Sequence, residues 1–218
     1  MNPLLNGIQI NDIVYGSPTK EQVDLIKQKG KSLKAVLSSE KSKYFFNKQY
    51  PDNVSLEVRE ELKELQKRTE NINKQDLEFA KISEKDHYQS WVDFLYSNGI
   101  SINKNFFNNI TANTDGLIYA TKYHYNRPRP FQLGVYHRLP VNQTILTSAN
   151  SPAFPSGHAF EAKLFALILS EKYPHAKIKI NDFAVRHAES RLNAGIHYRS
   201  DMEFGYELAE WVFSTKSF

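Results

Sequence analysis

The sequence contains no cysteine. Disulfide bridges, zinc sites built on thiolates and a cysteine nucleophile are therefore excluded. The missing disulfides do not identify a cellular compartment, because a helical domain of 218 residues is large enough to be stable without them.

Long hydrophobic runs are also missing. The most apolar stretch, residues 164–169, is far shorter than the run of about 18 apolar residues that a membrane span needs. Residues 1–16 lack the positive start and the continuous apolar segment of a secretory signal. We therefore expect a soluble cytoplasmic protein without integral membrane insertion, or a periplasmic or secreted one if a signal segment has been removed.

Neither sign of charge is in large excess. Lysine and arginine total 28 against 24 aspartates and glutamates, which gives a net charge of +4. This mild basic excess suits a small phosphorylated substrate. No nucleic-acid-binding motif accompanies the lysines of residues 27–34, so we interpret them as a solvated helix face and expect no nucleic-acid partner. No feature of the sequence indicates an oligomeric state.

Helical signals dominate and strand signals are scarce, which predicts an all-α fold. We expect one domain, a helical bundle over residues 1–218, with an N-terminal helical part at about 17–110 and a motif-bearing part at about 111–215. The expected helices span residues 17–46, a segment starting after Ser55, 74–97, a segment around 117–123 that ends before Arg127, 159–169, 178–195 and 199–214.

Two of these expectations are specific. The helix after Ser55 carries an apolar stripe of Leu56, Leu62 and Leu65. The stretch from Phe131 to Pro155 is rich in Asn, Pro and Ser and is predicted to be a loop. A loop of that length in a compact domain is usually functional.

Three clusters of chemically functional residues lie in the second half of the chain. Each is weak by itself, because a short helix start, an Arg-Pro pair or a His and Asp on one helix face all have ordinary structural explanations. Their occurrence together and in this order points to one site. The clusters are Lys122 with Arg129-Pro130, then Pro155-Ser156-Gly157-His158, then Ser190-Arg191 with His197 and Asp201.

The basic residues of these clusters suit a phosphate group. Arginine offers a planar fork that matches two phosphate oxygens, and lysine offers a point charge. Lys122, Arg129 and Arg191 together can offset the charge that spreads over the phosphate oxygens in a transition state. We therefore expect these three side chains to bind phosphate.

Ser156, Gly157 and His158 open the apolar helix. The first N–H groups of a helix have no partner within it and bind anions, and glycine lets the backbone approach an anion closely. The sequence therefore predicts that a phosphate group lies at this helix start.

The two histidines suit different roles. Asp201 lies four residues after His197, so the two share a helix face. A carboxylate that accepts from one imidazole nitrogen leaves the other nitrogen free as a nucleophile. His158 has no such partner nearby in the sequence, and we expect it to protonate the leaving group and then to activate water.

The three clusters resemble the signature motifs of the type 2 phosphatidic acid phosphatase superfamily. That superfamily includes class A non-specific acid phosphatases, which the chain resembles most, membrane lipid phosphatases and vanadium haloperoxidases. The resemblance covers residues 122–201 and implies an all-α bundle with a central site, His197 as the phosphorylated residue, His158 as general acid and no metal requirement. The phosphate ligands that it implies are Lys122, Arg129, Ser156, Gly157, His158 and Arg191.

Two other functions remain open. A vanadium-dependent haloperoxidase would use the same residues to hold vanadate as its cofactor, with His197 bonded to it, whereas the phosphatase needs no cofactor. The resemblance implies that haloperoxidases are usually much longer, so 218 residues favour phosphate monoester hydrolysis. A phosphate-binding module without catalysis is disfavoured, because binding does not need His197 backed by Asp201.

Several neighbouring residues receive secondary assignments. Arg127 precedes a second Arg-Pro step, but Ala120 stands where its lysine would be, so we expect a loop or surface role. We expect His124 to be peripheral and His187 to be a half-buried structural residue. Asp115 either orients Lys122 or is a solvated carboxylate. Core positions are expected for Trp91 and Trp211, and an effect on specificity for Tyr136, His137 and Arg138.

Overall fold

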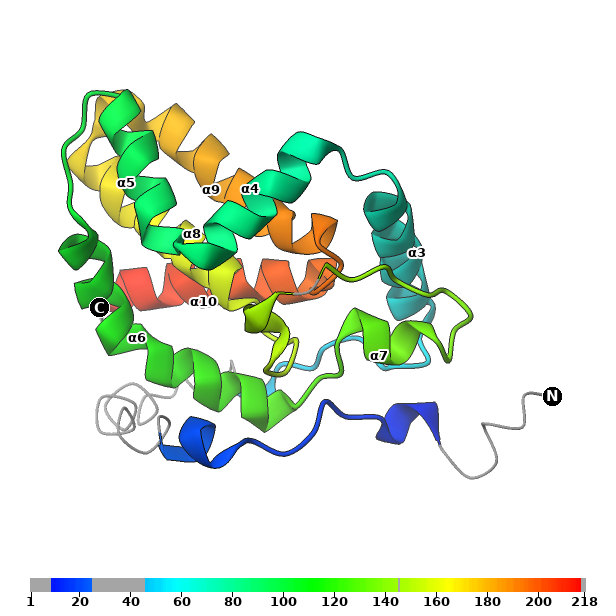
Figure 1. The fold of residues 1–218 in the computed structure, drawn as a ribbon. Helices are drawn as coiled ribbons and strands as arrows, with labels where there is room; N and C mark the ends of the chain where they lie inside the picture. The colour runs from blue at the N-terminus through cyan, green and yellow to red at the C-terminus, as the bar shows by residue number, and fades with distance from the viewer. Residues whose placement is uncertain (1–8, 25–45, 145, 217–218) are drawn as a thin grey trace.

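The computed structural model describes residues 9–24, 46–144 and 146–216. No strand occurs among these residues, so the predicted all-α fold is confirmed (Figure 1). That residues 1–218 form a single domain stays a prediction. In chain order the elements are η2 (Ile10–Asp12), α3 (Leu56–Glu70), α4 (Lys74–Lys85), α5 (His87–Ser97), α6 (Lys104–Tyr125), α7 (Pro130–Gly134), η3 (Thr147–Ala149), α8 (Gly157–Lys172), η4 (Pro174–Ala176), α9 (Lys177–Asn193) and α10 (Arg199–Thr215), where η marks a short 3-10 helix.

Helix α8 runs through the middle of the bundle, with α9 and α10 packed along it (Figure 1). It begins after Ser156, whose hydroxyl accepts a hydrogen bond from the N–H of Ala159 at 3.4 Å. Phe160 and Leu164 are among its fully buried side chains. The predicted apolar helix over residues 159–169 is confirmed and is largely buried, and the residues that open α8 are thereby fixed against the core.

A glycine lets α10 approach the start of α8 closely. A Cβ atom at Gly205 would lie 2.8 Å from the carbonyl oxygen of Ser156 and 3.2 Å from the backbone nitrogen of Phe160. Both are backbone atoms, which cannot turn aside as a flexible side chain would. The backbone N–H of Ser156 also donates to the carbonyl oxygen of Asp201 at 2.9 Å. The first turns of α8 and α10 are therefore held together.

The prediction of one helix from residue 74 to residue 97 is wrong. Asp86 separates α4 from α5, with φ −152° and ψ 77°. Its carboxylate accepts a hydrogen bond from the N–H of Gln89 at 3.0 Å, so it caps the start of α5. Aspartate is a favoured residue at this position because it satisfies one of the unpaired N–H groups of the first turn. The break places Glu84 near the bend between the two helices.

The first predicted helix begins later than expected. Residues 20–24 are helical, and the cap is Thr19 rather than Ser17. Thr19 N–H donates to the side chain of Gln22 at 2.8 Å, and Gln22 N–H donates to the hydroxyl of Thr19 at 3.3 Å. The rest of that predicted helix, residues 25–45, lies outside the described residues together with its lysines.

Helix α3 starts as predicted, but its apolar stripe is different. Ser55 accepts a hydrogen bond from the N–H of Val58 at 3.1 Å. Leu62 and Leu65 are buried, whereas Leu56 is 80% exposed. Val58, which is fully buried, takes the place predicted for Leu56. The stripe therefore starts two residues later and faces α9 and α7.

The predicted loop 131–155 is only partly irregular. Its beginning belongs to α7, which has a proline at its first position, and η3 lies near its end. The backbone carbonyls of Ser148, Ser151 and Pro152 accept hydrogen bonds from buried basic side chains. This loop therefore forms part of the wall around the cationic residues that the sequence assigns to phosphate binding.

Candidate active site

A cavity of about 270 Å³ lies where α6, the start of α8 and the residues before α10 meet. Four of the predicted site residues line it, namely Lys122, Gly157, His158 and His197. The remaining lining residues are Tyr88, Asp115, Ile118, Tyr119, Ser148, Ser151 and Glu161. The structure thus brings all three sequence clusters to one cavity.

His197 and Asp201 form a buried pair on the wall of this cavity. Nδ1 of His197 lies 3.1 Å from Oδ2 of Asp201, and Nε2 lies 3.0 Å from NH1 of Arg129. A carboxylate accepts and a guanidinium donates, so this environment fits the tautomer with its proton on Nδ1 and a lone pair on Nε2. His197 is 2% exposed and Asp201 is fully buried.

Burial lowers the pKa of both histidines below the usual range. For His197, the positive charges of Arg129 and Lys122 lower the pKa further. For His158, the positive charge of Arg191 has the largest effect after burial and lowers the pKa further. Both imidazoles are therefore neutral near pH 7 in the free protein. A neutral imidazole is the form that can act as a nucleophile, whereas a general acid needs a proton that a neighbouring anion would stabilise.

Arg129 is fixed beside His197 by backbone carbonyls. Its Nε donates to Ser151 O at 2.7 Å, NH1 to Ile196 O at 2.6 Å and NH2 to Ser148 O at 2.7 Å. The side chain is fully buried, and burial lowers its pKa to about 10, so it remains charged at neutral pH. The guanidinium is thus a fixed positive charge whose NH1 also reaches His197.

Lys122 and the start of α8 lie side by side. Lys122 Nζ donates to Pro152 O at 2.7 Å, and burial, with Arg129 nearby, lowers the pKa of this ammonium. A Cβ atom at Gly157 would lie 4.0 Å from Cε of Lys122, so the glycine leaves space beside the lysine. The N–H of Ser156 is engaged by the carbonyl of Asp201, so in this structure Ser156 caps the helix and ties it to α10.

Arg191 reaches the site together with a residue that the sequence did not reveal, Glu84. Arg191 NH1 donates to Glu84 Oε2 at 2.9 Å, and the same oxygen lies 3.9 Å from Nε2 of His158. Glu84 also accepts from Thr147 Oγ1 and from Ser148 N, both at 2.6 Å. Burial raises the pKa of Glu84, but these hydrogen bonds and Arg191 outweigh it and the net shift is downward. Glu84 is therefore an anion that links α4, α9 and η3 behind His158.

Arg127 lies in the loop between α6 and α7, as one of the two expectations had it, but the expectation of a surface role is wrong. Arg127 is fully buried, and its guanidinium forms ion pairs with Asp201 Oδ1 at 2.5 Å and with Glu61 Oε2 at 3.0 Å. It also donates to Ser200 Oγ at 2.8 Å. Ala120 stands where a partner lysine for Arg127 was sought, but it does not bear on the burial of Arg127, because the partners of this arginine are carboxylates from α3 and α10. Arg127 thus binds Oδ1 of Asp201, whereas His197 lies beside Oδ2.

The secondary histidine and tryptophan assignments mostly hold. His187 is structural, but it is fully buried rather than half-buried, with Nε2 2.9 Å from Ser90 Oγ and its ring stacked on Trp91. Trp91 and Trp211 are core residues, as predicted. His124 is exposed and contacts a backbone carbonyl away from the cavity.

Asp115 lines the same cavity as Lys122. The loop residues Tyr136, His137 and Arg138 are not among the described residues that line this cavity. His137 instead lies against α3, with Nε2 2.6 Å from Asn53 O. Their position therefore gives no support to an effect on specificity.

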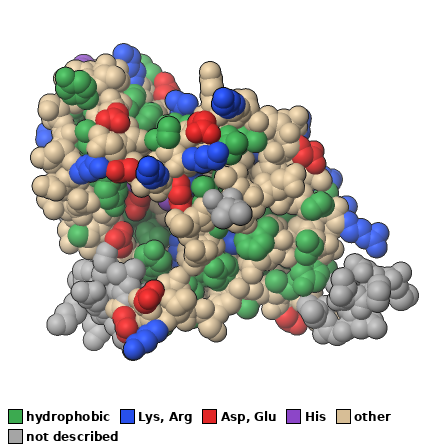
Figure 2. Space-filling view, in the orientation of Figure 1, with side chains coloured by type: hydrophobic (Ala, Val, Ile, Leu, Met, Phe, Trp, Pro, Cys, Tyr) green, Lys and Arg blue, Asp and Glu red, His purple; other side chains and the backbone are tan. Residues whose placement is uncertain are grey.

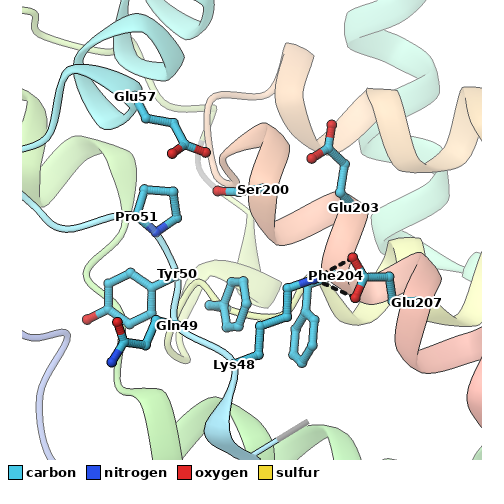
Figure 3. Close-up of a pocket in the computed structure, with 10 residues that line it drawn as sticks. Lys48, Gln49, Tyr50, Pro51, Glu57, Ser200, Glu203, Phe204 and Glu207 are labelled. Atoms are coloured by element: carbon cyan, nitrogen blue, oxygen red, sulfur yellow. Dashed lines mark hydrogen bonds and ion pairs between the residues drawn. The ribbon is translucent and has the colours of Figure 1, made fainter. Parts of the chain in front are cut away.

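A second cavity, of about 310 Å³, is lined mainly by residues 48–51 and by side chains of α10 (Figure 3). Glu57, Glu203 and Glu207 line it, and Lys48 bonds to both carboxylate oxygens of Glu207. Three carboxylates make this cavity unsuited to a phosphate group. The candidate active site is therefore the histidine-lined cavity.

Three further observations concern surface charge, membrane-spanning helices and metal sites. Acidic and basic side chains are interspersed over the face shown in Figure 2, as the balanced composition predicts. No helix within the described ranges combines the length and the apolar character needed to cross a membrane. Within those ranges, no group of three or more His, Asp and Glu side chains is placed to hold a metal ion.

Residues 104–213 match the family model of the PAP2 superfamily, which is more than half of the chain. The chain belongs to the PAP2 superfamily. The predicted resemblance is thereby confirmed, and the matched range contains every site residue that the sequence singled out. Glu61 and Glu84 lie outside this PAP2 range, so the N-terminal helices contribute residues of their own to the site.

A curated relative and a solved structure are also similar. The chain is 32% identical over 130 residues to a non-specific acid phosphatase of Salmonella typhimurium, across 58% of this chain and 45% of the relative's length. The solved structure is described as the first transmembrane PAP2-type phosphatidylglycerolphosphate phosphatase from Bacillus subtilis. It is 14% identical, with a TM-score of 0.51 over 90% of this chain and 94% of that one. At that identity the similarity concerns the fold alone.

Proposed function

We propose that this protein hydrolyses phosphate monoesters of small molecules through a phosphohistidine intermediate. The observation that carries the proposal is the position of His197, with Nδ1 beside Asp201 and Nε2 beside Arg129 on the wall of the cavity. Membership of the PAP2 superfamily supports phosphatase chemistry, and the acid phosphatase relative supports a phosphate monoester as substrate.

Phosphate binding is assigned to the cationic residues and to the first turn of α8. Lys122 lines the cavity, Arg129 is buried beside His197, and Arg191 binds Glu84 behind His158. These charges would offset the negative charge that the phosphoryl group carries in the transition state. We propose that they do so without a metal ion, so that hydrolysis continues in the presence of EDTA.

The first chemical step breaks the bond between phosphorus and the leaving oxygen. The lone pair on Nε2 of His197 forms a bond to phosphorus while the P–O bond to the leaving group breaks. His158 donates its proton to the leaving alkoxide, which departs as an alcohol. Asp201 stabilises the positive charge that the His197 ring acquires when Nε2 is phosphorylated.

The second step returns the enzyme to its starting state. His158, now neutral, removes a proton from a water molecule whose oxygen attacks the phosphorus atom. The bond between Nε2 and phosphorus breaks, its electron pair returns to the imidazole of His197, and inorganic phosphate is released. One water molecule is consumed, and the alcohol and phosphate are the products.

The cavity limits the size of the substrate. Its volume of about 270 Å³ fits a phosphate group with a small organic substituent. Tyr88, Tyr119 and Glu161 line the same cavity as His158 and would contact that substituent. We therefore propose a small phosphorylated metabolite as the substrate.

The test is release of phosphate from an aryl phosphate by matched histidine variants. His197→Ala is expected to abolish activity, because no other group supplies the nucleophile. His175→Ala is the control, since His175 is exposed on η4 and does not line the cavity. Full activity of His197→Ala would refute the assignment of the nucleophile.

Vanadate binding is a further part of the proposal. Five-coordinate vanadate resembles the phosphoryl group during transfer, so the same residues would hold it, and orthovanadate is expected to inhibit competitively. The haloperoxidase alternative stays a prediction, and it is tested by peroxide-dependent halide oxidation after vanadate loading.

A further inference from the structure

We propose that Arg127 is a positioning residue for the reaction, and that Glu61 is part of the same device. In this proposal a buried network of three side chains, Glu61, Arg127 and Asp201, sets the orientation and the charge balance of His197. The proposal rests on His197 being the nucleophile.

The first argument is geometric. Arg127 NH1 binds Oδ1 of Asp201 at 2.5 Å, which leaves Oδ2 to accept from His197 Nδ1 at 3.1 Å and from Tyr198 N at 2.9 Å. The two carboxylate oxygens therefore have separate partners. Because Arg127 fixes one oxygen, the other is aimed at the imidazole and cannot rotate away.

The second argument concerns the choice of side chain. Arg127 NH2 reaches Glu61 Oε2 at 3.0 Å while NH1 holds Asp201. A guanidinium fork can bind two carboxylates at a fixed distance, which a single ammonium cannot. Burial lowers the pKa of Arg127, but Asp201 and Glu61 outweigh this effect and raise it. The arginine is therefore a permanent charge inside the protein.

The third argument concerns solvent. The guanidinium carbon lies 3.9 Å from the ring centre of Tyr198, 5.0 Å from that of Tyr50 and 6.0 Å from that of Phe154. Tyr50 and Phe154 also line the second cavity (Figure 3). The aromatic rings separate Arg127 from water, so its interactions with the carboxylates are only weakly screened.

The fourth argument is the charge count. Glu61 and Asp201 carry two negative charges and Arg127 carries one positive charge, so these three side chains together have a net charge of about −1. Phosphorylation of Nε2 gives the His197 ring a positive charge. The net negative charge of Glu61, Arg127 and Asp201 balances that positive charge. Without Glu61, Arg127 and Asp201 would be neutral together. Glu61 is thus expected to favour the phosphorylated state of His197.

The test is Glu61→Gln, which keeps the shape of the side chain and one acceptor while removing the charge. The matched control is Glu60→Gln on the same helix, where the carboxylate is 66% exposed and pairs only with Lys63 at 2.6 Å. We expect Glu61→Gln to lower kcat at least about tenfold. The inhibition constant of inorganic phosphate should change less than about threefold, because the phosphate ligands are untouched. Glu60→Gln should match the parent protein.

Arg127→Lys supplies a second variant, and it should lose more kcat than Glu61→Gln because lysine cannot hold both carboxylates. A kcat for Glu61→Gln within twofold of the parent protein would overturn the proposal. So would a loss of kcat that comes with an equal weakening of phosphate binding and a fall in Tm, because a purely structural role predicts that pattern. His197→Ala is measured alongside, and activity in that variant would refute the proposed function. If His197→Ala is inactive and Glu61→Gln is unaffected, only the role of the Glu61, Arg127 and Asp201 network is refuted.

Discussion

Replacement of Asp201 by asparagine tests the tautomer of His197. The carboxylate of Asp201 receives three donors, from Arg127, Tyr198 and His197. An asparagine amide has only one acceptor oxygen. Its NH2 group must therefore face one of the former donors, either the guanidinium or the backbone N–H together with the imidazole.

The hydrogen-bond energies decide between these orientations. A hydrogen bond to a charged donor contributes about 1.5–3 kcal/mol, and a neutral one contributes about 1 kcal/mol. The amide oxygen should therefore stay on Arg127, and the amide NH2 should face Nδ1 of His197. Nδ1 must then accept, the ring proton moves to Nε2, and the nucleophilic lone pair is lost. A substitution that reverses the tautomer of a catalytic histidine lowers kcat by about 10⁴-fold.

The assay is steady-state release of phosphate by Asp201→Asn, with Asp93→Asn as the control. Asp93 is exposed on α5 and contacts Gln89 only on the surface. Both variants should be checked by circular dichroism, so that a loss of fold is recognised. A kcat for the folded Asp201→Asn variant within tenfold of the parent protein would refute the assignment of Asp201.

Three further predictions follow from the geometry. Burial lowers the pKa of His158 well below its usual range, and this residue must be protonated to act as an acid, so kcat/KM should fall as the pH rises through that lowered pKa. The pKa of His197 is also lowered, so this imidazole stays neutral in mild acid, and an alkaline optimum would contradict both assignments. Gly205→Ala should lower the free energy of unfolding by about 1–3 kcal/mol in a denaturant titration, because the added methyl group would meet backbone atoms at 2.8 Å and 3.2 Å; an unchanged midpoint would show that α10 can shift freely. Glu84→Ala should lower the free energy of unfolding by about 2–3 kcal/mol, because Arg191 would lose its carboxylate partner. An unchanged free energy of unfolding would mean that Arg191 finds other acceptors.

The motif residues were predictable because each carries its chemistry locally. Ser156 and Gly157 mark a helix start. The four-residue spacing of His197 and Asp201 predicted that the two residues meet, but the predicted shared helix face is wrong: His197 precedes the cap of α10, Asp201 lies in its first turn, and they contact each other across the helix start. The break between α4 and α5 was also readable, because Asp86 followed by Gln89 is the pattern of a helix start. This local signal is weak beside the helical composition of the segments on either side of it.

Arg127, Glu61 and Glu84 could not be assigned from the sequence in the same way. Glu61 meets Arg127 from α3, and Glu84 meets Arg191 from α4, so each pair joins parts of the chain that are far apart. Local periodicity carries no information about such contacts. The buried state of Arg127 follows from tertiary packing, because its charge is tolerated only where two carboxylates and three aromatic rings surround it.

The most direct measurement of the central claim is to trap the phosphorylated enzyme. A radiolabelled aryl phosphate is mixed with the protein, the reaction is stopped with base within milliseconds, and the labelled peptide is identified by mass spectrometry. The account predicts a phosphate group on His197 that is stable to base and lost in acid, and no label in the His197→Ala variant. Label on Ser156 or on another residue, or a single turnover that releases phosphate with no labelled enzyme, would contradict it.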